Sequence, residues 1–275
     1  MRAGPIAAMS AIVLLASAVA AVALGATGYT PSLELRPLAE FYLEHCLNPY
    51  DRGCWAASPE AVTSMLWDYR GLDTLYETAV FFLAIVGSVA LFRFADAALA
   101  SYEEGARRRG RGEEGLSLIV RVVTRIVFVL IVALSAAIAL HGHLTPGGGF
   151  QGGSIFAVAP ILAIAAFSRR FLEGLGLTRG RCLAIRTSGL VAIAVVALTP
   201  LASILLGSTS FIMQNQPKPW APSSPGLPVS LGPIWLAGTL MLLNVAEYLT
   251  VASGFTLLFI LLALPEEFYR RLMGR

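Results

Sequence analysis

Charge is scarce in this sequence. Asp, Glu, Lys and Arg make up 13% of the 275 residues, whereas hydrophobic residues make up 56% and the mean hydropathy is +0.72. Several apolar runs reach the roughly 18 residues that indicate a membrane-spanning helix. This composition excludes an ordinary soluble domain and indicates an all-α, polytopic membrane helix bundle.

Histidine and cysteine are scarce too, with three of each. None of the histidines (His45, His141 and His143) lies at the centre of a predicted span, which argues against a bis-histidine haem. An iron–sulfur cluster fails on ligand number and topology, because two cysteines are predicted outside and one inside: Cys46, Cys54 and Cys182. We therefore expect no cofactor and no metal site in this chain.

Cys46 and Cys54 share one outer loop, and a disulfide between them would close a short ring. Such bonds form in oxidising compartments outside the cytoplasm. Both a disulfide and two free thiols agree with the sequence.

The apolar runs predict six spans. The first, residues 6–26, can be a signal peptide, but its single positive charge and its length favour a retained helix. Pro200 is expected to kink the fifth span near its end. A short interfacial or half-helix piece is expected before the last span. The others are 78–94, 118–140, 147–167, 183–206 and 240–264.

Positive charge is distributed unevenly between the two sides of these spans. With Arg2 inside, 16 of the 20 Lys and Arg residues fall on the inner side or at inner helix ends, Arg186 among them. The outer loops retain only four: Arg36, Arg52, Arg70 and Lys218. This skew follows the positive-inside rule and predicts that both termini are cytoplasmic.

A glycine-rich stretch, residues 141–153, separates the third and fourth spans on the predicted outer face. Residues 154–167 alone are too short to cross a bilayer, whereas a helix from Gly147 is long enough. The glycines must then be helical or packed against protein, and they allow another backbone to approach closely. No strand precedes the stretch and no lysine follows it, which excludes a dinucleotide fingerprint and a P-loop.

Residues 142–153, GHLTPGGGFQGG, resemble the signature of the MnhB domain. This domain forms the MnhB subunit of Mrp-type multisubunit Na⁺/H⁺ antiporters, and it recurs in the MbhF-like subunits of archaeal membrane-bound hydrogenases and sulfur-reducing complexes. The resemblance implies a four-helix membrane domain over residues 116–275. Its motif and packing residues are Gly142, Pro146, Gly147, Gly148, Gly149, Phe150, Gln151, Gly152 and Gly153.

A second resemblance lies in residues 67–78, WDYRGLDTLYET. They are similar to a segment shared by the MbhE protein of membrane-bound hydrogenases and the C-terminal end of MrpA, the large protein of the Mrp antiporters. The resemblances imply two parts, 1–102 and 116–275, that correspond to neighbouring subunits. The charged stretch 103–115 between them is predicted to be a cytoplasmic linker, with docking to an acidic partner or anionic lipid as an additional role. Residues 28–64 match neither part.

Polar residues before the second span permit two compatible interpretations. Thr74 and Glu77 have the spacing of a capping box, and Asp73 suits a helix N-terminus and can pair with Arg70. Alternatively, the carboxylates near the membrane surface collect or conduct Na⁺ or H⁺, namely Asp68, Asp73 and Glu77.

His143 is either a protonatable group at an ion entrance or a hydrogen-bonded post that holds the glycine-rich turn. His141 is a weaker candidate, and Gln151 is expected to face protein. Glu247 lies about two turns inside the last span, on the same face as Asn244. A carboxyl in a span normally faces a partner, a cavity or water, so this pair indicates an ion pathway or a contact between helices.

The resemblance implies a non-catalytic integral subunit of an Mrp-type antiporter module in the cell membrane, with Na⁺ and H⁺ as the transported ions. The implied partners are other antiporter subunits, hydrogenase-like or sulfur-reductase-like subunits and the lipid bilayer, without nucleic acid. No lysine lies in a predicted span, which argues against a complete antiporter in this chain alone. The alternatives are an independent transporter or channel and a purely structural role in assembly.

Overall fold

The computed structural model describes residues 3–24, 34–46, 48, 50, 53–92, 116–223 and 227–263. The chain forms two compact units, Met1–Phe41 and Tyr42–Arg275. The predicted linker 103–115 lies outside the described residues, and the division of the chain on either side of it stays a prediction.

The first unit contains α1, Ala3–Leu24. Its 22 residues would extend about 33 Å, enough to cross a hydrocarbon core. Its side chains from Met9 to Leu24 are exposed, and all but two serines are apolar. The helix predicted over residues 6–26 is therefore present.

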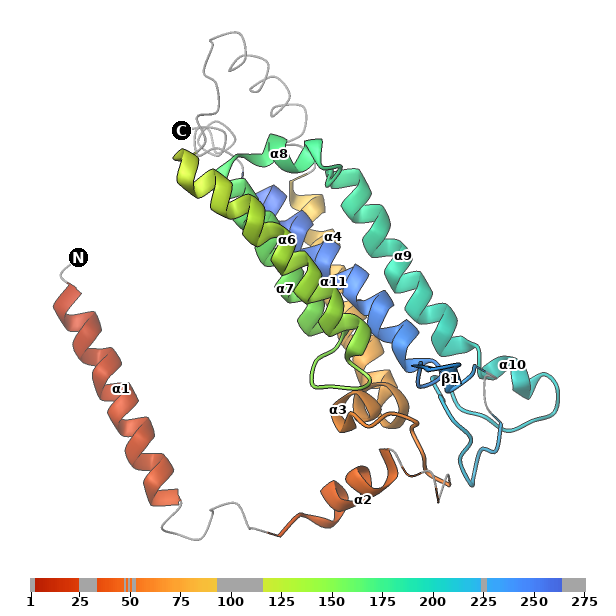
Figure 1. Ribbon diagram of the computed structural model, residues 1–275. Coiled ribbons are helices and arrows are strands. Elements are labelled where there is room, and N and C mark those ends of the chain that lie inside the picture. The colour runs from red at the N-terminus through yellow and green to blue at the C-terminus, as the bar shows by residue number, and fades with distance from the viewer. Residues whose placement is uncertain are drawn as a thin grey trace. The chain divides into compact units, whose positions relative to one another are not determined.

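In the second unit, five helices of the described residues are long and apolar enough to cross a membrane. They run alongside one another in Figure 1. These five helices confirm the predicted polytopic helix bundle. Their bounds are α4, Gly71–Leu91; α6, Leu118–His141; α7, Gly149–Ala166; α9, Arg179–Leu198; and α11, Leu240–Leu262.

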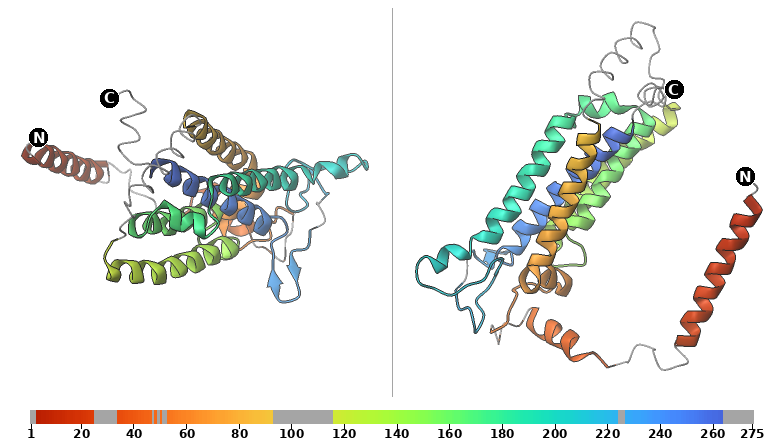
Figure 2. Two further views of the ribbon diagram at one scale, coloured as in Figure 1. Left: turned by 90° about the horizontal axis from the view of Figure 1, so that it is seen from above. Right: turned by 180° about the vertical axis from the view of Figure 1, so that it is seen from behind.

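Helix α11 is the central helix of this bundle. It packs against α4, α6, α7 and α9, and α6 also packs along α7. Of its most apolar stretch 61% is buried, against 17% in α4 and in α6. The views in Figure 2 show α4 and α6 on opposite sides of α11. Polar residues on α11 therefore face protein rather than lipid.

Short elements close the two ends of the bundle, which are called inner and outer after the sides that the charge bias predicts. At the inner end, α8 (Arg169–Gly174) joins α7 to α9. At the outer end, α3 (Ala61–Ser64) continues into a π-helical turn, η2 (Met65–Tyr69), that leads into α4. Helix α2 (Pro37–Cys46) precedes these elements in the chain.

The half-helix predicted before the last span is wrong. A small antiparallel hairpin, β1 (Ser230–Leu231) and β2 (Ile234–Trp235), occupies that place. Its two-residue turn, Gly232-Pro233, needs the positive φ of +59° that glycine adopts readily. The last span nevertheless begins at Leu240, as predicted.

The capping box at Thr74 and Glu77 is also wrong, because α4 begins three residues earlier, at Gly71. The η2 turn runs almost directly into α4, so Thr74 lies inside the helix. Its hydroxyl donates to the Leu66 carbonyl at 2.7 Å. The predicted pairing of Arg70 with Asp73 is confirmed.

The possible disulfide is not formed. Cys46 and Cys54 are both free, and the buried Cys46 thiol donates to the carbonyl of Tyr42. Pro200 acts as predicted: α9 ends at Leu198, and the short α10 (Leu201–Ile204) follows the break.

Candidate functional site around the glycine-rich turn and α11

The glycine-rich turn lies at the outer end of the bundle, between α6 and α7. Gly147 has a φ of +144°, which a side chain would strain. A Cβ on Gly142 would lie 2.7 Å from the Cα of Gly148, so the turn folds tightly on itself. Gly142 and Gly148 are buried, and Pro146 is exposed.

The three glycines at the start of α7 lie where two neighbouring helices approach. A Cβ on Gly149 would come within 2.7 Å of the Glu247 side chain, and one on Gly153 within 2.7 Å of Val251, both on α11. A Cβ on Gly152 would lie 2.8 Å from the carbonyl oxygen of Ser135 on α6. Glycine thus lets α7 sit directly against both helices, as its spacing in the sequence indicated.

Glu247 occupies the space that the missing side chains leave. It is 7% exposed, and its Oε2 accepts a hydrogen bond from the backbone N–H of Phe150 at 3.1 Å. Phe150 is in the first turn of α7, where N–H groups lack partners inside the helix and the helix dipole favours negative charge. The carboxylate therefore caps α7 from a neighbouring helix.

Asn244 lies one turn towards the outer end of α11 and is 1% exposed. Its Oδ1 accepts a hydrogen bond from Nε1 of Trp67 at 2.9 Å. Its Nδ2 has no hydrogen-bond partner among the described residues and lies beside Gly142. Asn244 thus joins the η2 turn to the central helix.

His143 is 2% exposed and serves as a fixed point of the turn. Because the carbonyl of Trp235 can only accept, Nε2 carries the proton and donates to it at 2.7 Å. Burial lowers the pKa of His143 below its ordinary value, and the bond to Trp235 acts in the opposite direction. A neutral, hydrogen-bonded imidazole favours the interpretation as a structural post. His141 is exposed, and its Nδ1 lies 2.9 Å from the carbonyl oxygen of Ala137.

Residues that precede α4 also hold the glycine-rich turn. The hydroxyl of Thr63 donates to the carbonyl of Gly142 at 2.6 Å, and that of Ser58 donates to the carbonyl of His143. These bonds satisfy backbone groups that the irregular turn cannot pair internally.

Phe150 and Gln151 follow the turn in the first residues of α7. The ring of Phe150 meets those of Phe81 and Phe255 edge-on at centroid distances of 6.2 and 6.4 Å. Gln151 is exposed, so the expectation that it faces protein is not met within this chain.

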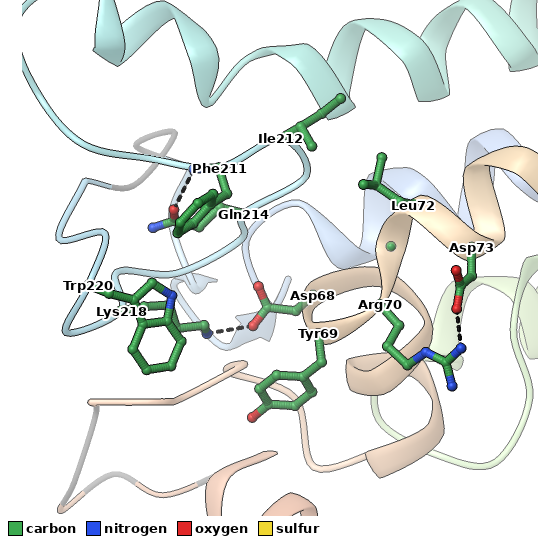
Figure 3. Close-up of a pocket in the computed structure, with 11 residues that line it drawn as sticks. Asp68, Tyr69, Arg70, Leu72, Asp73, Phe211, Ile212, Gln214, Lys218 and Trp220 are labelled. Carbon is green, nitrogen blue, oxygen red and sulfur yellow. Dashed lines mark hydrogen bonds and ion pairs between the residues drawn. The ribbon is translucent and has the colours of Figure 1, made fainter.

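Asp68 is fully buried beside a cavity of about 490 Å³ at the outer end (Figure 3). Its carboxylate accepts from Lys218 Nζ at 2.7 Å and from the backbone N–H of Asn215 at 3.0 Å. Burial raises the pKa of Asp68, while Lys218 and the Asn215 N–H oppose that shift. Lys218 also donates to the carbonyl of Trp55 at 2.7 Å.

Asp73 lines the same cavity and pairs with Arg70 at the surface. Both carboxylates of the cavity therefore have a basic partner already, which argues against cation collection by them. Glu77 is exposed on α4.

The sequence does not predict that two charged side chains are buried. Lys218, the chain's single lysine, is a buried partner of Asp68 rather than a loop charge. Arg186 is 0% exposed inside α9, not at an inner helix end. The sequence predicts that this helix begins at residue 183, whereas it begins four residues earlier, at Arg179. In the predicted helix, Arg186 would lie close to the start.

Among the described residues, no group of three or more His, Cys, Asp or Glu side chains is arranged to hold a metal ion.

These features define a multi-pass membrane protein whose central helix carries a buried carboxyl against a glycine-rich helix start. Residues 119–257 match the MnhB family, described as a domain related to the MnhB subunit of Na⁺/H⁺ antiporter. The match covers slightly more than half of the chain, and the chain belongs to this family. It is a membrane protein of the antiporter-subunit type.

Two curated relatives resemble parts of the chain. An uncharacterised protein of Methanocaldococcus jannaschii is 34% identical over 118 residues, which are 40% of this chain and 44% of that protein. A putative antiporter subunit, MnhB2, of Staphylococcus haemolyticus is 32% identical over 100 residues, which are 36% of this chain and 66% of that protein. The chain thus spans less than two thirds of either relative.

Two solved structures share the fold. The Mrp complex of Dietzia sp. aligns with 96% of this chain and 26% of the matched chain, at a TM-score of 0.58 and 20% identity. The membrane-bound sulfane sulfur reductase, an archaeal respiratory membrane complex, aligns with 95% of this chain and 100% of the matched chain, at 0.58 and 21%.

Gly149→Ala should destabilise the protein, because the new Cβ would collide with the backbone of α11 at Asn244 and with Glu247. Overpacking of this kind costs about 1–3 kcal/mol. Gly87→Ala on α4 is the matched control, since its Cβ would meet nothing within 4 Å. Thermal unfolding in detergent should show a lower Tm for Gly149→Ala alone. Equal Tm values would contradict the close approach of α7 and α11.

Breaking the buried ion pair should destabilise the outer end. Lys218→Met leaves Asp68 buried and unpaired, which costs about 3–5 kcal/mol. Asp68→Asn should also destabilise, and the double variant should lose much less than the sum of the two. A double-mutant cycle on chemical unfolding measures this coupling, and additive losses would mean that the two charges do not interact.

His143 should make stability depend on pH. Its pKa is lowered in the folded state, so below about pH 6.5 the unfolded chain binds the proton more readily and the free energy of unfolding falls. Thermal unfolding should therefore show a Tm that decreases between about pH 7 and pH 5. In His143→Gln, whose amide can still donate to Trp235, this part of the slope should vanish; an unchanged slope would assign it to other groups.

Proposed function

We propose that this chain is a non-catalytic integral subunit of an Mrp-type antiporter module and supports exchange of Na⁺ for H⁺. The observation that carries the proposal is the contact between Glu247 and the first turn of α7, which lies within the family's match. It combines an ionisable group inside a span with the most distinctive sequence of the family.

Glu247 has the properties of a group that takes up and releases a proton. A buried carboxylate is costly in a membrane span, so such groups are generally functional. The Phe150 N–H and the dipole of α7 favour its charged form, while its burial favours the neutral form. The geometry therefore places opposed influences on one carboxyl group.

Protonation of Glu247 would also change the contact between α7 and α11. A neutral carboxyl accepts a weaker hydrogen bond from Phe150 than a carboxylate does. Because Gly149 brings the helices together here, the change would reach the glycine-rich turn above it. A proton could thereby be coupled to the surface that the turn presents to its neighbours.

The chain is proposed to act within a larger assembly rather than alone. Its single lysine is tied to Asp68, outside the spans of the described residues. Exposed apolar side chains run along α6, including Leu118, Ile119 and Val123, and are available to lipid or to neighbouring subunits. We further propose that the assembly is a respiratory complex with hydrogenase-like or sulfur-reductase-like subunits, since one of the structures that share the fold is a respiratory membrane complex.

A purely structural role is the second candidate. It is favoured by His143, which is buried, neutral and bonded to Trp235, and by the dense hydrogen bonding of the turn within this chain. On that view Glu247 only caps α7, and its replacement would loosen the assembly instead of slowing ion exchange.

Glu247→Gln should lower Na⁺-driven proton exchange at least about tenfold in proteoliposomes that contain the complete complex, a rise of about 1.4 kcal/mol in the barrier. Gln keeps an acceptor for the Phe150 N–H but cannot release a proton. The matched control is Glu44→Gln, which changes an exposed carboxylate on α2. Exchange is followed with a pH-sensitive dye.

The complex is purified through this chain, and its subunits are identified by mass spectrometry. Lost exchange in an intact complex supports the proposal, whereas a dissociated complex supports the structural role. Normal exchange in an intact complex would contradict the proposal. The same analysis tells whether hydrogenase-like or sulfur-reductase-like subunits accompany the antiporter subunits.

A further inference from the structure

Arg186 is a buried charge that the proposed function does not use. It is 0% exposed on α9, and its Nη1 donates to the carbonyl of Thr250 on α11 at 3.2 Å. Its Nε and Nη2 have no hydrogen-bond partner within the described part of the chain. Gly254 makes room for the guanidinium, since a Cβ there would overlap Nη1. The bundle is therefore shaped around this group.

No carboxylate of the described residues forms an ion pair with Arg186. Two aromatic rings of α4 stand in place of a counter-ion: the guanidinium carbon lies 4.7 Å from the ring centroid of Phe81 and 5.0 Å from that of Phe82. Cation–π contacts stabilise a desolvated guanidinium but do not neutralise it. A net positive charge thus remains inside the bundle, about 10 Å from the start of α9.

Aromatic rings connect the surroundings of this charge with those of Glu247. The ring of Phe81 lies against the guanidinium on one side and meets the rings of Phe150 and Phe255 at 6.2 and 5.0 Å. The backbone N–H of the same Phe150 donates the hydrogen bond that Glu247 accepts. Along α4, Phe81 follows Glu77 by one turn towards the inner end. Along α11, Thr250, whose carbonyl Arg186 contacts, follows Glu247 by three residues towards the inner end, so the guanidinium lies inward of the carboxyl.

This buried charge creates a barrier to cations. A fixed positive charge in a medium of low dielectric constant repels Na⁺ and hydronium strongly. The aromatic rings packed against the guanidinium also disfavour water, and without a chain of water a proton cannot move past them. Both effects act on the inner side of Glu247.

We propose that Glu247 exchanges its proton with the outer side only, and that Arg186, held against Phe81, closes the inner side of this chain's bundle to cations. The first half rests on the proposed function, whereas the second does not. It follows that Na⁺ and H⁺ cross the membrane along the contacts of this chain with other subunits, not through its own helices.

The test is passive leak through the intact complex in proteoliposomes without an exchange gradient. Arg186→Met should raise the leak of protons, and of radioactive Na⁺, at least about tenfold, because removal of a unit charge from a low-dielectric site lowers the barrier by more than one decade in rate. The variant should still fold, since apolar replacement of a buried charge is often neutral or stabilising. Arg186→Lys keeps the positive charge, so its leak should equal that of the wild type.

Arg125→Met is the matched control, because Arg125 is exposed on α6 and its guanidinium lies over the ring of Phe167. It removes the same charge without opening the bundle, and its leak should equal that of the wild type. A wild-type leak in the Arg186→Met complex would overturn the barrier. So would an equal rise in Arg125→Met, which would assign the effect to net charge.

Sidedness is tested on the unaltered complex with a membrane-impermeant carbodiimide, which modifies protonated carboxyl groups. Added to the outer side of oriented vesicles it should label Glu247, as peptide mass spectrometry would detect, and added to the inner side it should not. Labelling from the inner side overturns the proposal even if Arg186→Met fails to assemble. Full exchange in Glu247→Gln together with a leak in Arg186→Met would refute the proposed function and leave the barrier standing.

Discussion

The close contact between the first turn of α7 and the central helix α11 is the constraint on which the outer half of the bundle depends. Glu247 can be buried there because an N–H group at a helix start faces it, and that group can approach because Gly149 and Gly153 have no side chains. Any residue larger than glycine would separate the helices and leave the carboxyl without its partner. One backbone contact thereby determines both the packing and the electrostatics.

Polar contacts at the outer end connect other segments of the unit Tyr42–Arg275 to this contact. Segments on either side of the predicted linker interlock through polar contacts: Trp67 with Asn244, Asp68 with Lys218, and Thr63 with Gly142. Each contact pairs a group that would otherwise be buried at a cost. Within the unit Tyr42–Arg275, the segments before and after the predicted linker therefore pack together.

The buried charges of the described residues are handled in three different ways. Asp68 and Lys218 neutralise each other, and Glu247 is stabilised by a helix start. Arg186 contacts aromatic rings and one carbonyl among the described residues, so its charge is the least compensated of these. Burial of an uncompensated charge lowers stability. The proposed barrier to cations would give the electric field of Arg186 a function, and this function is consistent with the position of the residue between two helices of the core.

The sequence by itself determined the class of protein, the start of α11 and the distinctive turn, because hydropathy acts locally along the chain. Only the tertiary structure decided what the polar residues touch. Hydropathy cannot reveal that a π-helical turn continues into α4, so the sequence predicts a helix N-cap at Thr74 that the structure does not have. A four-residue error at the start of α9 moved Arg186 from the core to a helix end. The pairing of Asp68 with Lys218 joins residues 150 positions apart, a distance over which no local pattern carries information.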